Sequence, residues 1–405
     1  MNGELDRRLR AAFRAIDLPA APPDLVAQLD DLPLVAVHPV VRRSRVSSSA
    51  MLAASVVLAV AGVLLVRSVS PGAGPGGPGP AGESPRSTPS ATPSTTPALP
   101  TATVRPGTPR ITGGMLVRID ASTGAIQRVV STGPHPGLVV TAGARVWTMN
   151  FGDGTLSRVD PSADGPSIAT TFAGDAVGIA ADGDDVWVAA DDHDLVRLDG
   201  TTGIEEARLQ VADETIFRLR DAGFIVVTDD SLWLTVPDLR IRAAPHGFWR
   251  IDPRSGEVRA RLTIDRDPHP PIVYEGSIFV LSVSKSTLTR VDPATNAMTV
   301  VRVGNEPVMA DSGDGSIWIG HGLDKVVWRV DPDSLQTQAR IPIGEPVRGL
   351  AFGAGRIWIT TPTSLHEIDP TTNTVVASVR LLKVPMKYSP AALAVLDGSV
   401  WVAID

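Results

Sequence analysis

One motif recurs seven times in this sequence and limits the fold more than any other feature. Each copy begins with a turn and a strand centred on an aromatic residue, as in "RVWTM", "SIWIG" and "SVWVA". About a dozen residues later, another strand ends in an apolar residue followed by aspartate. The aromatic positions are Trp147, Trp187, Trp233, Phe279, Trp318, Trp358 and Trp401, and the aspartates are Asp120, Asp160, Asp199, Asp252, Asp292, Asp331 and Asp369. A spacing of about 40 residues with several short strands is typical of propeller blades. The sequence therefore predicts an all-β, seven-bladed β-propeller over residues 111–405.

Each repeat is predicted to supply four strands, most clearly in residues 346–381, where they read "PVRGLAF", "RIWITT", "SLHEIDP" and "TVVASVRL". The first segments of the repeat region, "GMLVRID" and "AIQRVV", match the third and fourth strands, and the last, "AALAVL" and "SVWVAID", match the first and second. One blade is therefore expected to combine both ends in a 2+2 closure. The closure pairs the C-terminal strand with the strand at Met115 and leaves no free sheet edge. The tryptophans are expected to fill the wedges between blades.

This pattern resembles the YVTN-type propeller repeat family over about 295 of the 405 residues. The resemblance implies the fold, whereas the scaffold serves receptors, adhesion modules and several classes of enzyme. Among the enzymes, streptogramin lyase is a seven-bladed propeller similar to this one, and its repeats typically read W-F-T-E, with glutamates and histidines that support a magnesium ion. The corresponding positions here read "WTMN", "WVAA", "WLTV", "FVLS", "WIGH", "WITT" and "WVAI", without a glutamate. A metal-dependent lyase or hydrolase is therefore the alternative to a binding or sensing module.

Residues 47–67 are predicted to form a single transmembrane helix. The 21 residues between Arg45 and Arg67 carry no charge, and at about 1.5 Å per residue they span roughly 30 Å, enough to cross a hydrocarbon core. Three arginines precede the segment and one follows it closely. The positive-inside rule thus places the N-terminus in the cytoplasm and the propeller on the outer side of the cell membrane. There are two other interpretations of this segment. A cleaved signal peptide would begin closer to the N-terminus and end in an A-x-A site. A twin-arginine signal would have further characteristic residues around Arg42 and Arg43, and these are missing.

Residues 1–46 are predicted to form a helical cytoplasmic tail. Leu5, Leu9, Phe13 and Ile16 fall on one face of a helix, with arginines largely on the others. This layout resembles the N-terminal tails of actinobacterial membrane anti-sigma factors, although the zinc-type signature of a histidine followed by C-x-x-C is absent. The resemblance implies a cytoplasmic sigma factor as partner. An amphipathic helix that lies along the inner leaflet is the alternative.

Residues 68–110 are predicted to be a stalk between the membrane and the propeller. Eleven prolines occur in the 39 residues 71–109, and such a segment stays extended because it cannot form a core. Its "SPRSTPSATPSTTP" run is similar to O-glycosylated mucin-like stalks.

The chain has no cysteine, which excludes disulfides and thiolate chemistry. Residues 1–70 carry a charge of +2 and the remainder −9, so nucleic acid is not expected as a partner of the propeller.

The repeated aspartates are interpreted as structural residues. Each precedes a tight turn such as "DPRSG" or "DPTTN", in which a carboxylate accepts hydrogen bonds from backbone N–H groups. An arginine stands two residues before the aspartate in six repeats, and Glu367 is the exception. This spacing places both side chains on one face of a strand. A surface pair between the arginine and the aspartate of the same strand is therefore predicted.

A candidate ligand site follows from the residues just before each innermost strand, which are expected to ring one mouth of the central channel. They are His135, Asp175, His269, Glu306, Glu345 and Ser389, and the third blade cannot be aligned. His269, Glu306 and Glu345 come from consecutive blades and could share a divalent cation, because nitrogen and oxygen donors suit magnesium, calcium, manganese or zinc. The alternative is that these positions are simply polar and solvated.

Three insertions, at 212–222, 237–246 and 383–389, lengthen loops at the same face. Long loops of this kind often carry function. The sequence therefore predicts an extracytoplasmic binding or sensing module. Its ligand is expected to be a small molecule, a glycan or a protein, held on the face of the interblade loops.

Overall fold

The computed structural model describes residues 111–163, 165, 168–170, 176–190, 194–211, 224–236, 246–382 and 390–405. The predicted tail, membrane segment and stalk lie outside this part of the chain, as do Asp175, Ser389 and the three insertions apart from His246. Among the described residues, no helix has the length and apolar character needed to cross a membrane.

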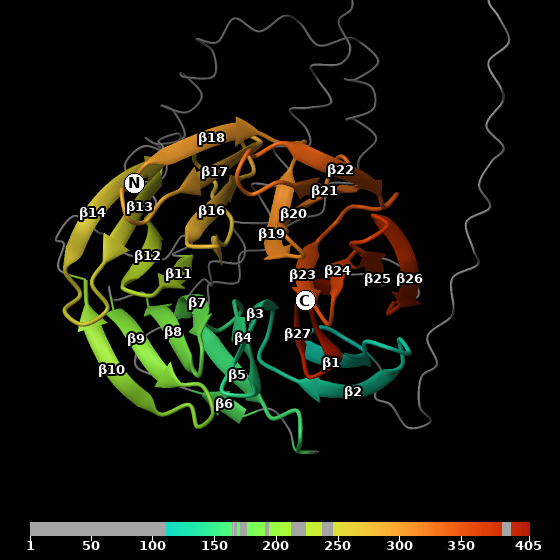
Figure 1. The fold of residues 1–405 in the computed structure, drawn as a ribbon. Helices are drawn as coiled ribbons and strands as arrows, with labels where there is room; N and C mark the ends of the chain where they lie inside the picture. The colour runs from blue at the N-terminus through green and yellow to red at the C-terminus, as the bar shows by residue number, and fades with distance from the viewer. Residues whose placement is uncertain are drawn as a thin grey trace, which may run out of the picture. The chain divides into compact units, whose positions relative to one another are not determined.

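The described residues form seven four-stranded antiparallel sheets arranged as blades around a central axis (Figure 1). In each blade the strands follow the chain from the axis outward, apart from the blade that joins the two ends. The blades built from one continuous stretch are β3 (Pro136–Ala142), β4 (Arg145–Asn150), β5 (Thr155–Val159) and β6 (Ile168–Thr170); β7 (Ala176–Asp182), β8 (Asp185–Ala190), β9 (Asp194–Asp199) and β10 (Glu205–Gln210); β11 (Ile225–Thr228), β12 (Ser231–Val236), β13 (His246–Ile251) and β14 (Val258–Ile264); β15 (Ile272–Tyr274), β16 (Ser277–Ser282), β17 (Thr287–Val291) and β18 (Met298–Arg302); β19 (Pro307–Gly313), β20 (Ser316–His321), β21 (Val326–Val330) and β22 (Thr337–Pro342); and β23 (Gly349–Gly353), β24 (Arg356–Thr360), β25 (Ser364–Asp369) and β26 (Thr374–Arg380). The predicted seven-bladed all-β fold is confirmed.

The seventh blade combines the two ends of the repeat region, as predicted. Its strand order is β2 (Ile126–Ser131), β1 (Met115–Asp120), β28 (Ser399–Ile404) and β27 (Pro390–Leu396). In Figure 1 the teal β1 and β2 lie beside the red β27. β1 pairs with β28 along its whole length, from Met115 opposite Ile404 to Asp120 opposite Ser399. We call this sheet the closure blade.

The aromatic residue of each second strand is buried between its own blade and the next. Trp401 of β28 is fully buried and packs with Val146 and Val159 of the adjacent blade. Phe279 occupies the same place in the β15–β18 blade and packs with Ile317 of the blade that follows. The excess of tryptophan therefore reflects the repeated wedge between blades, as the sequence predicted. We call the interface between two neighbouring blades a seam.

The repeat aspartates cap the turns between third and fourth strands. Oδ1 of Asp120, for example, accepts hydrogen bonds from the backbone N–H groups of Ser122 and Thr123 at 3.0 and 2.9 Å, and also from their hydroxyls. Hydrogen bonds of this kind, from hydroxyls and from the backbone, lower the pKa of all seven carboxyls below the usual value. These aspartates are thus structural, as predicted.

Four of the six repeat arginines bind across the seams and not to the aspartate of the same strand, so the predicted pairing is wrong for them. A fifth, Arg197, forms ion pairs with Asp185 and Glu206 of its own blade. Nη1 of Arg329 donates to the carbonyl oxygen of Pro370 in the next blade at 2.6 Å. Equivalent bonds link Arg118 to Pro161, Arg250 to Pro293 and Arg290 to Pro332, at 2.9, 2.6 and 3.3 Å. The aspartate carboxylate already accepts hydrogen bonds from the turn that follows it, whereas the backbone carbonyl of the corresponding turn in the next blade lies within reach of the arginine. We call this interaction the seam arginine contact.

Candidate functional site

The two ends of the propeller differ in the kinds of connection that they carry. Consecutive strands run in opposite directions, so the connections into each innermost strand lie at the same end as the loops between second and third strands. We call this the loop end. The aspartate turns lie at the opposite end, with the hairpins between first and second strands, and we call that the turn end. The predicted site residues that the structure describes, His135, His269, Glu306 and Glu345, belong to connections at the loop end.

His135 and Glu306 occupy equivalent positions at the loop end, as the sequence alignment predicted. Both have a φ of 52° and precede a proline that begins an innermost strand. The carbonyl of His135 accepts a 2.9 Å hydrogen bond from the N–H of Phe151, and the carbonyl of Glu306 accepts one of the same length from Gly322. Each bond joins the residue to the loop that follows the second strand of its own blade.

In the β15–β18 blade this position belongs to Asp267 and not to His269. Asp267 has a φ of 53°, and its carbonyl accepts a 3.1 Å hydrogen bond from the N–H of Val283. The following residue, Pro268, bridges to Ser282 as Pro136 pairs with Asn150. The segment "DPHPP" contains more than one proline that could start the strand. The alignment of the repeats used Pro270, whereas the proline equivalent to Pro136 is Pro268, so the predicted site residue lies two positions too far along the chain.

His269 lies further along the chain and is packed between blades. Its ring centroid is 6.4 Å from that of Phe224, and the ring makes a hydrogen bond with the Val308 backbone. Its Nδ1 atom is buried without a partner among the described residues. Burial lowers the pKa of His269 below the usual value for histidine, so the imidazole is neutral at pH 7.

Glu345 is exposed and belongs to a connection of different shape. The positive φ falls on the preceding Gly344, at 84°, and β23 begins only at Gly349. His269, Glu306 and Glu345 therefore come from connections of three different geometries. No group of three or more His, Asp or Glu side chains within the described residues is placed to hold a metal ion. The metal assignment consequently rests on the sequence alignment alone.

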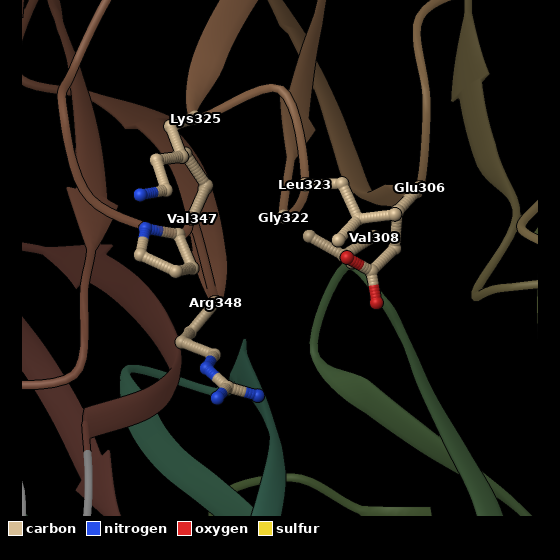
Figure 2. A pocket seen from close by; sticks show the side chains of 8 residues that line it. Glu306, Val308, Gly322, Leu323, Lys325, Val347 and Arg348 are labelled. Atoms are coloured by element: carbon tan, nitrogen blue, oxygen red, sulfur yellow. The ribbon is translucent and has the colours of Figure 1, made fainter. Parts of the chain in front are cut away.

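The structure does reveal a cavity at the loop end, between the β19–β22 blade and the β23–β26 blade. Its volume is about 200 Å³. Glu306 and Leu323 lie on one side, and Lys325 and Arg348 lie on the other (Figure 2). The remaining lining consists of Val308, Gly322, Pro346 and Val347. The cavity thus combines an apolar floor with one acidic and two basic side chains.

The three charged side chains around this cavity have no hydrogen-bond or ion-pair partner in the part of the chain that the structure describes. Within the described residues, no ion pair or hydrogen bond is recorded for the Glu306 carboxylate, the Lys325 ammonium or the Arg348 guanidinium. His135, at the position equivalent to Glu306, differs, because its Nδ1 lies 2.6 Å from Oδ1 of Asp405. Charged groups without protein partners around a concavity are available for a ligand.

The position of Glu306 is set by the loop on which it packs. Asp324 accepts hydrogen bonds from the backbone N–H and the Nδ2 of Asn305, at 2.7 and 2.8 Å, and so fixes the residue before Glu306. A Cβ atom on Gly322 would lie 2.5 Å from Oε2 of Glu306, so a larger residue at position 322 would displace the Glu306 carboxylate from this place. Beside this loop, burial lowers the pKa of His321 to about 4. The imidazole of His321 is therefore neutral and packs against Trp328, with ring centroids 5.1 Å apart.

Sequence reasoning found Glu306 but missed Lys325 and Arg348. Lys325 is one of only four lysines in a chain rich in arginine, and it lies in a loop at the loop end. The rarity of lysine is the sequence feature that could have drawn attention to Lys325. No sequence feature marks Arg348 as a site residue, because its position near Lys325 depends on how one blade packs against the next.

No protein-family model matches this chain. No curated protein matches it in sequence. Among solved structures, apo AztD from Citrobacter koseri is similar with a TM-score of 0.51 at 13% sequence identity, and the match covers 71% of this chain and 88% of that one. BamB from Moraxella catarrhalis is similar with a TM-score of 0.45 at 14% identity, covering 73% of this chain and 92% of that one. At such identities the likeness to AztD shows the propeller fold alone.

Proposed function

We propose that the propeller is a non-enzymatic binding module for a small zwitterionic ligand, held in the cavity at the loop end. One observation carries the proposal: Glu306, Lys325 and Arg348 surround one cavity and have no partner within the described residues. A ligand carboxylate or phosphate would be bound by Lys325 and Arg348. A ligand ammonium would be bound by Glu306. A neutral glycan would leave all three charges unpaired.

The size of the cavity supports a ligand of about amino-acid size. Drug-sized ligands occupy pockets of about 300–1,000 Å³, and this cavity, at about 200 Å³, is smaller. Val308, Leu323 and Val347 supply an apolar surface for a ligand side chain. Leu323 is 70% exposed, so ligand contact would remove apolar surface from water.

The binding module is further proposed to be extracytoplasmic, anchored by residues 47–67 and raised on the stalk of residues 68–110. Support comes from the uncharged apolar segment and from the arginines before it. In this arrangement the tail of residues 1–46 is the part of the chain that reports occupancy to the cytoplasm, and a sigma factor is its proposed partner.

Isothermal titration calorimetry on the full-length chain, with a panel of free amino acids, tests the binding proposal. For an amino acid that binds, we expect N-acetylation and carboxyl amidation each to weaken binding, because each removes one of the two charges. A Lys325→Gln/Arg348→Gln variant should lose the carboxylate contribution, and Glu306→Gln should lose the ammonium contribution. Arg302→Gln, an exposed substitution on β18, is the matched control and should bind as the unaltered chain does. Equal binding by all variants, or binding that ignores both modifications, would contradict the proposal.

A further inference from the structure

The seam between the β23–β26 blade and the closure blade lacks the seam arginine contact. Glu367 stands where the six other repeats have arginine. The register is the same in all of them: Glu367 pairs with Trp358 across strands, as Arg329 pairs with Trp318 and Arg118 with Trp401. The change is therefore one of side chain and not of backbone.

Four of the other seams, those of Arg118, Arg250, Arg290 and Arg329, show which group fills this space. The guanidinium of Arg329 lies 4.9 Å from the centroid of the Trp318 ring, and that of Arg118 lies 5.6 Å from the centroid of Trp401. Each also donates to a carbonyl of the turn in the next blade, at 2.6 and 2.9 Å. A planar cation thus stacks on an indole and bonds across the seam, a combination that suits guanidinium.

Glu367 does not take over this role, because it bonds within its own blade. Its Oε1 accepts a 2.9 Å hydrogen bond from Nε of Arg356 at the start of β24. In the blade before it, that position is Ser316, whose Oγ accepts a hydrogen bond from Nε of the seam arginine, Arg329. In this blade the arginine therefore stands on the second strand and its acceptor on the third, the reverse of the blade before it, and Arg356 does not line the seam space.

The space left in this seam is a cavity of about 210 Å³. Its lining includes Trp358, Glu367, Ala121, Thr123, Ser378 and Val379. Ala121 corresponds to Pro370 and Pro161, whose carbonyls accept the seam arginine contacts. Its own carbonyl has no recorded donor among the described residues. The cavity therefore presents an indole, a carboxylate and a free acceptor carbonyl together.

We propose that this cavity binds a guanidinium group supplied from outside the chain, either by a free small molecule or by an arginine side chain of a partner. The group stacks on Trp358 and donates to the Ala121 carbonyl and to the Glu367 carboxylate. A lysine ammonium fits less well, because it is a compact point charge without a planar face. The aspartate turn that contributes Ala121 places this site at the turn end. It is thus separate from the cavity of Glu306 and independent of the function proposed for it.

The test uses the full-length chain labelled with ¹⁵N at the tryptophan indoles and titrated with N-acetyl-arginine amide. Trp358→Phe assigns the Trp358 resonance, and phenylalanine already occupies the equivalent position at Phe279. We expect a saturable shift of that resonance. N-acetyl-citrulline amide, a neutral analogue of the same shape, should cause no such shift. N-acetyl-lysine amide should bind at least about tenfold more weakly.

Two variants and a control make the result specific. Glu367→Gln should weaken binding about tenfold, because a charge-assisted hydrogen bond becomes a neutral one. Arg356→Ser/Glu367→Arg rebuilds the arrangement of Ser316 and Arg329 and should abolish binding without lowering the melting temperature. Glu257→Gln, an exposed acid in another turn, should bind as the unaltered chain does. Equal affinity for citrulline and arginine, no saturable shift, or unchanged binding by the double variant would overturn the proposal.

The source of the guanidinium is identified by comparing free L-arginine with the blocked peptide Ala-Ala-Arg-Ala-Ala amide. Tighter binding of the peptide assigns the site to an arginine of a partner chain. Tighter binding of free arginine assigns it to a small molecule.

Discussion

Nη1 of Arg329 lies 2.6 Å from the carbonyl oxygen of Pro370, and this hydrogen bond joins two neighbouring blades. The same guanidinium lies over Trp318, with its carbon 4.9 Å from the ring centroid. The described strands of successive blades belong to separate sheets, so the attachment of one blade to the next depends on buried aromatic wedges and on polar contacts of this kind. The seam is therefore the structural unit in which substitutions should matter most.

Arg329→Gln is expected to destabilise the propeller by about 2 kcal/mol. The variant loses a charged hydrogen bond, at about 1.5–3 kcal/mol, and stacking on Trp318. Urea denaturation of the full-length chain measures the change. Arg302→Gln, which alters an exposed arginine on β18, should change stability by less than about 0.5 kcal/mol. Similar midpoints for the two variants would show that the seam arginine contact contributes little.

Deletion of residues 400–405 is expected to open the ring. It removes most of β28, which pairs with β1, and it removes Trp401, which is fully buried. Loss of a buried tryptophan alone costs about 3–5 kcal/mol, against a total stability of roughly 5–15 kcal/mol for a domain. Thermal denaturation should show a large fall in melting temperature. Asp405→Asn is the control, because it alters only the exposed contact between this side chain and His135 and should cost at most about 1 kcal/mol. A truncated chain that melts like the intact one would refute the closure.

Asp311→Asn is expected to remove a loss of stability that the propeller shows as the pH rises through about 6. Burial raises the pKa of Asp311 to about 6, although the N–H groups of Phe352 and Ser312 donate to its carboxylate at 2.8 Å each. Because the folded pKa lies above the unfolded value, the stability that Asp311 contributes is full below about pH 4 and is lost as the pH rises through 6. The loss amounts to about 3 kcal/mol.

Unfolding free energies between pH 4 and pH 8 check this prediction. The asparagine variant keeps an acceptor for only one of the two N–H groups, which costs stability at every pH. It carries no charge, so its stability relative to the unaltered chain should rise from pH 4 to pH 8. Asp397→Asn, which changes an exposed aspartate in a hairpin turn, is the matched control. A constant difference at every pH for Asp311→Asn would exclude the titration of this carboxyl.

Reporter fusions test the proposed topology. A reporter that works only outside the cytoplasm should be active when fused after Asp405, and one that works only inside should be active when fused before Arg42. The reason is the excess of arginine before residues 47–67. The reverse pattern would contradict the proposed anchor and orientation.

The candidate site was only partly predictable from the sequence. Glu306 was found because a glutamate before a proline is visible in an alignment of repeats. The same alignment selected His269, because it could not tell which proline of "DPHPP" pairs with the second strand. That choice depends on the bridge between Pro268 and Ser282, which is a property of the folded sheet. Lys325 and Arg348 come from different blades, and only the seam brings them to one cavity.

The repeat pattern by itself determined the number of blades, the four strands of each and the 2+2 closure, because these depend on hydrophobic periodicity and on the phase of the repeats at the chain ends. It also determined that the aspartates cap turns, since each bonds to residues two or three positions along the chain. Only the tertiary structure decided where the repeat arginines bind and that the exchange of arginine for Glu367 leaves a cavity. Those outcomes depend on distances between blades about 40 residues apart, which no local pattern encodes.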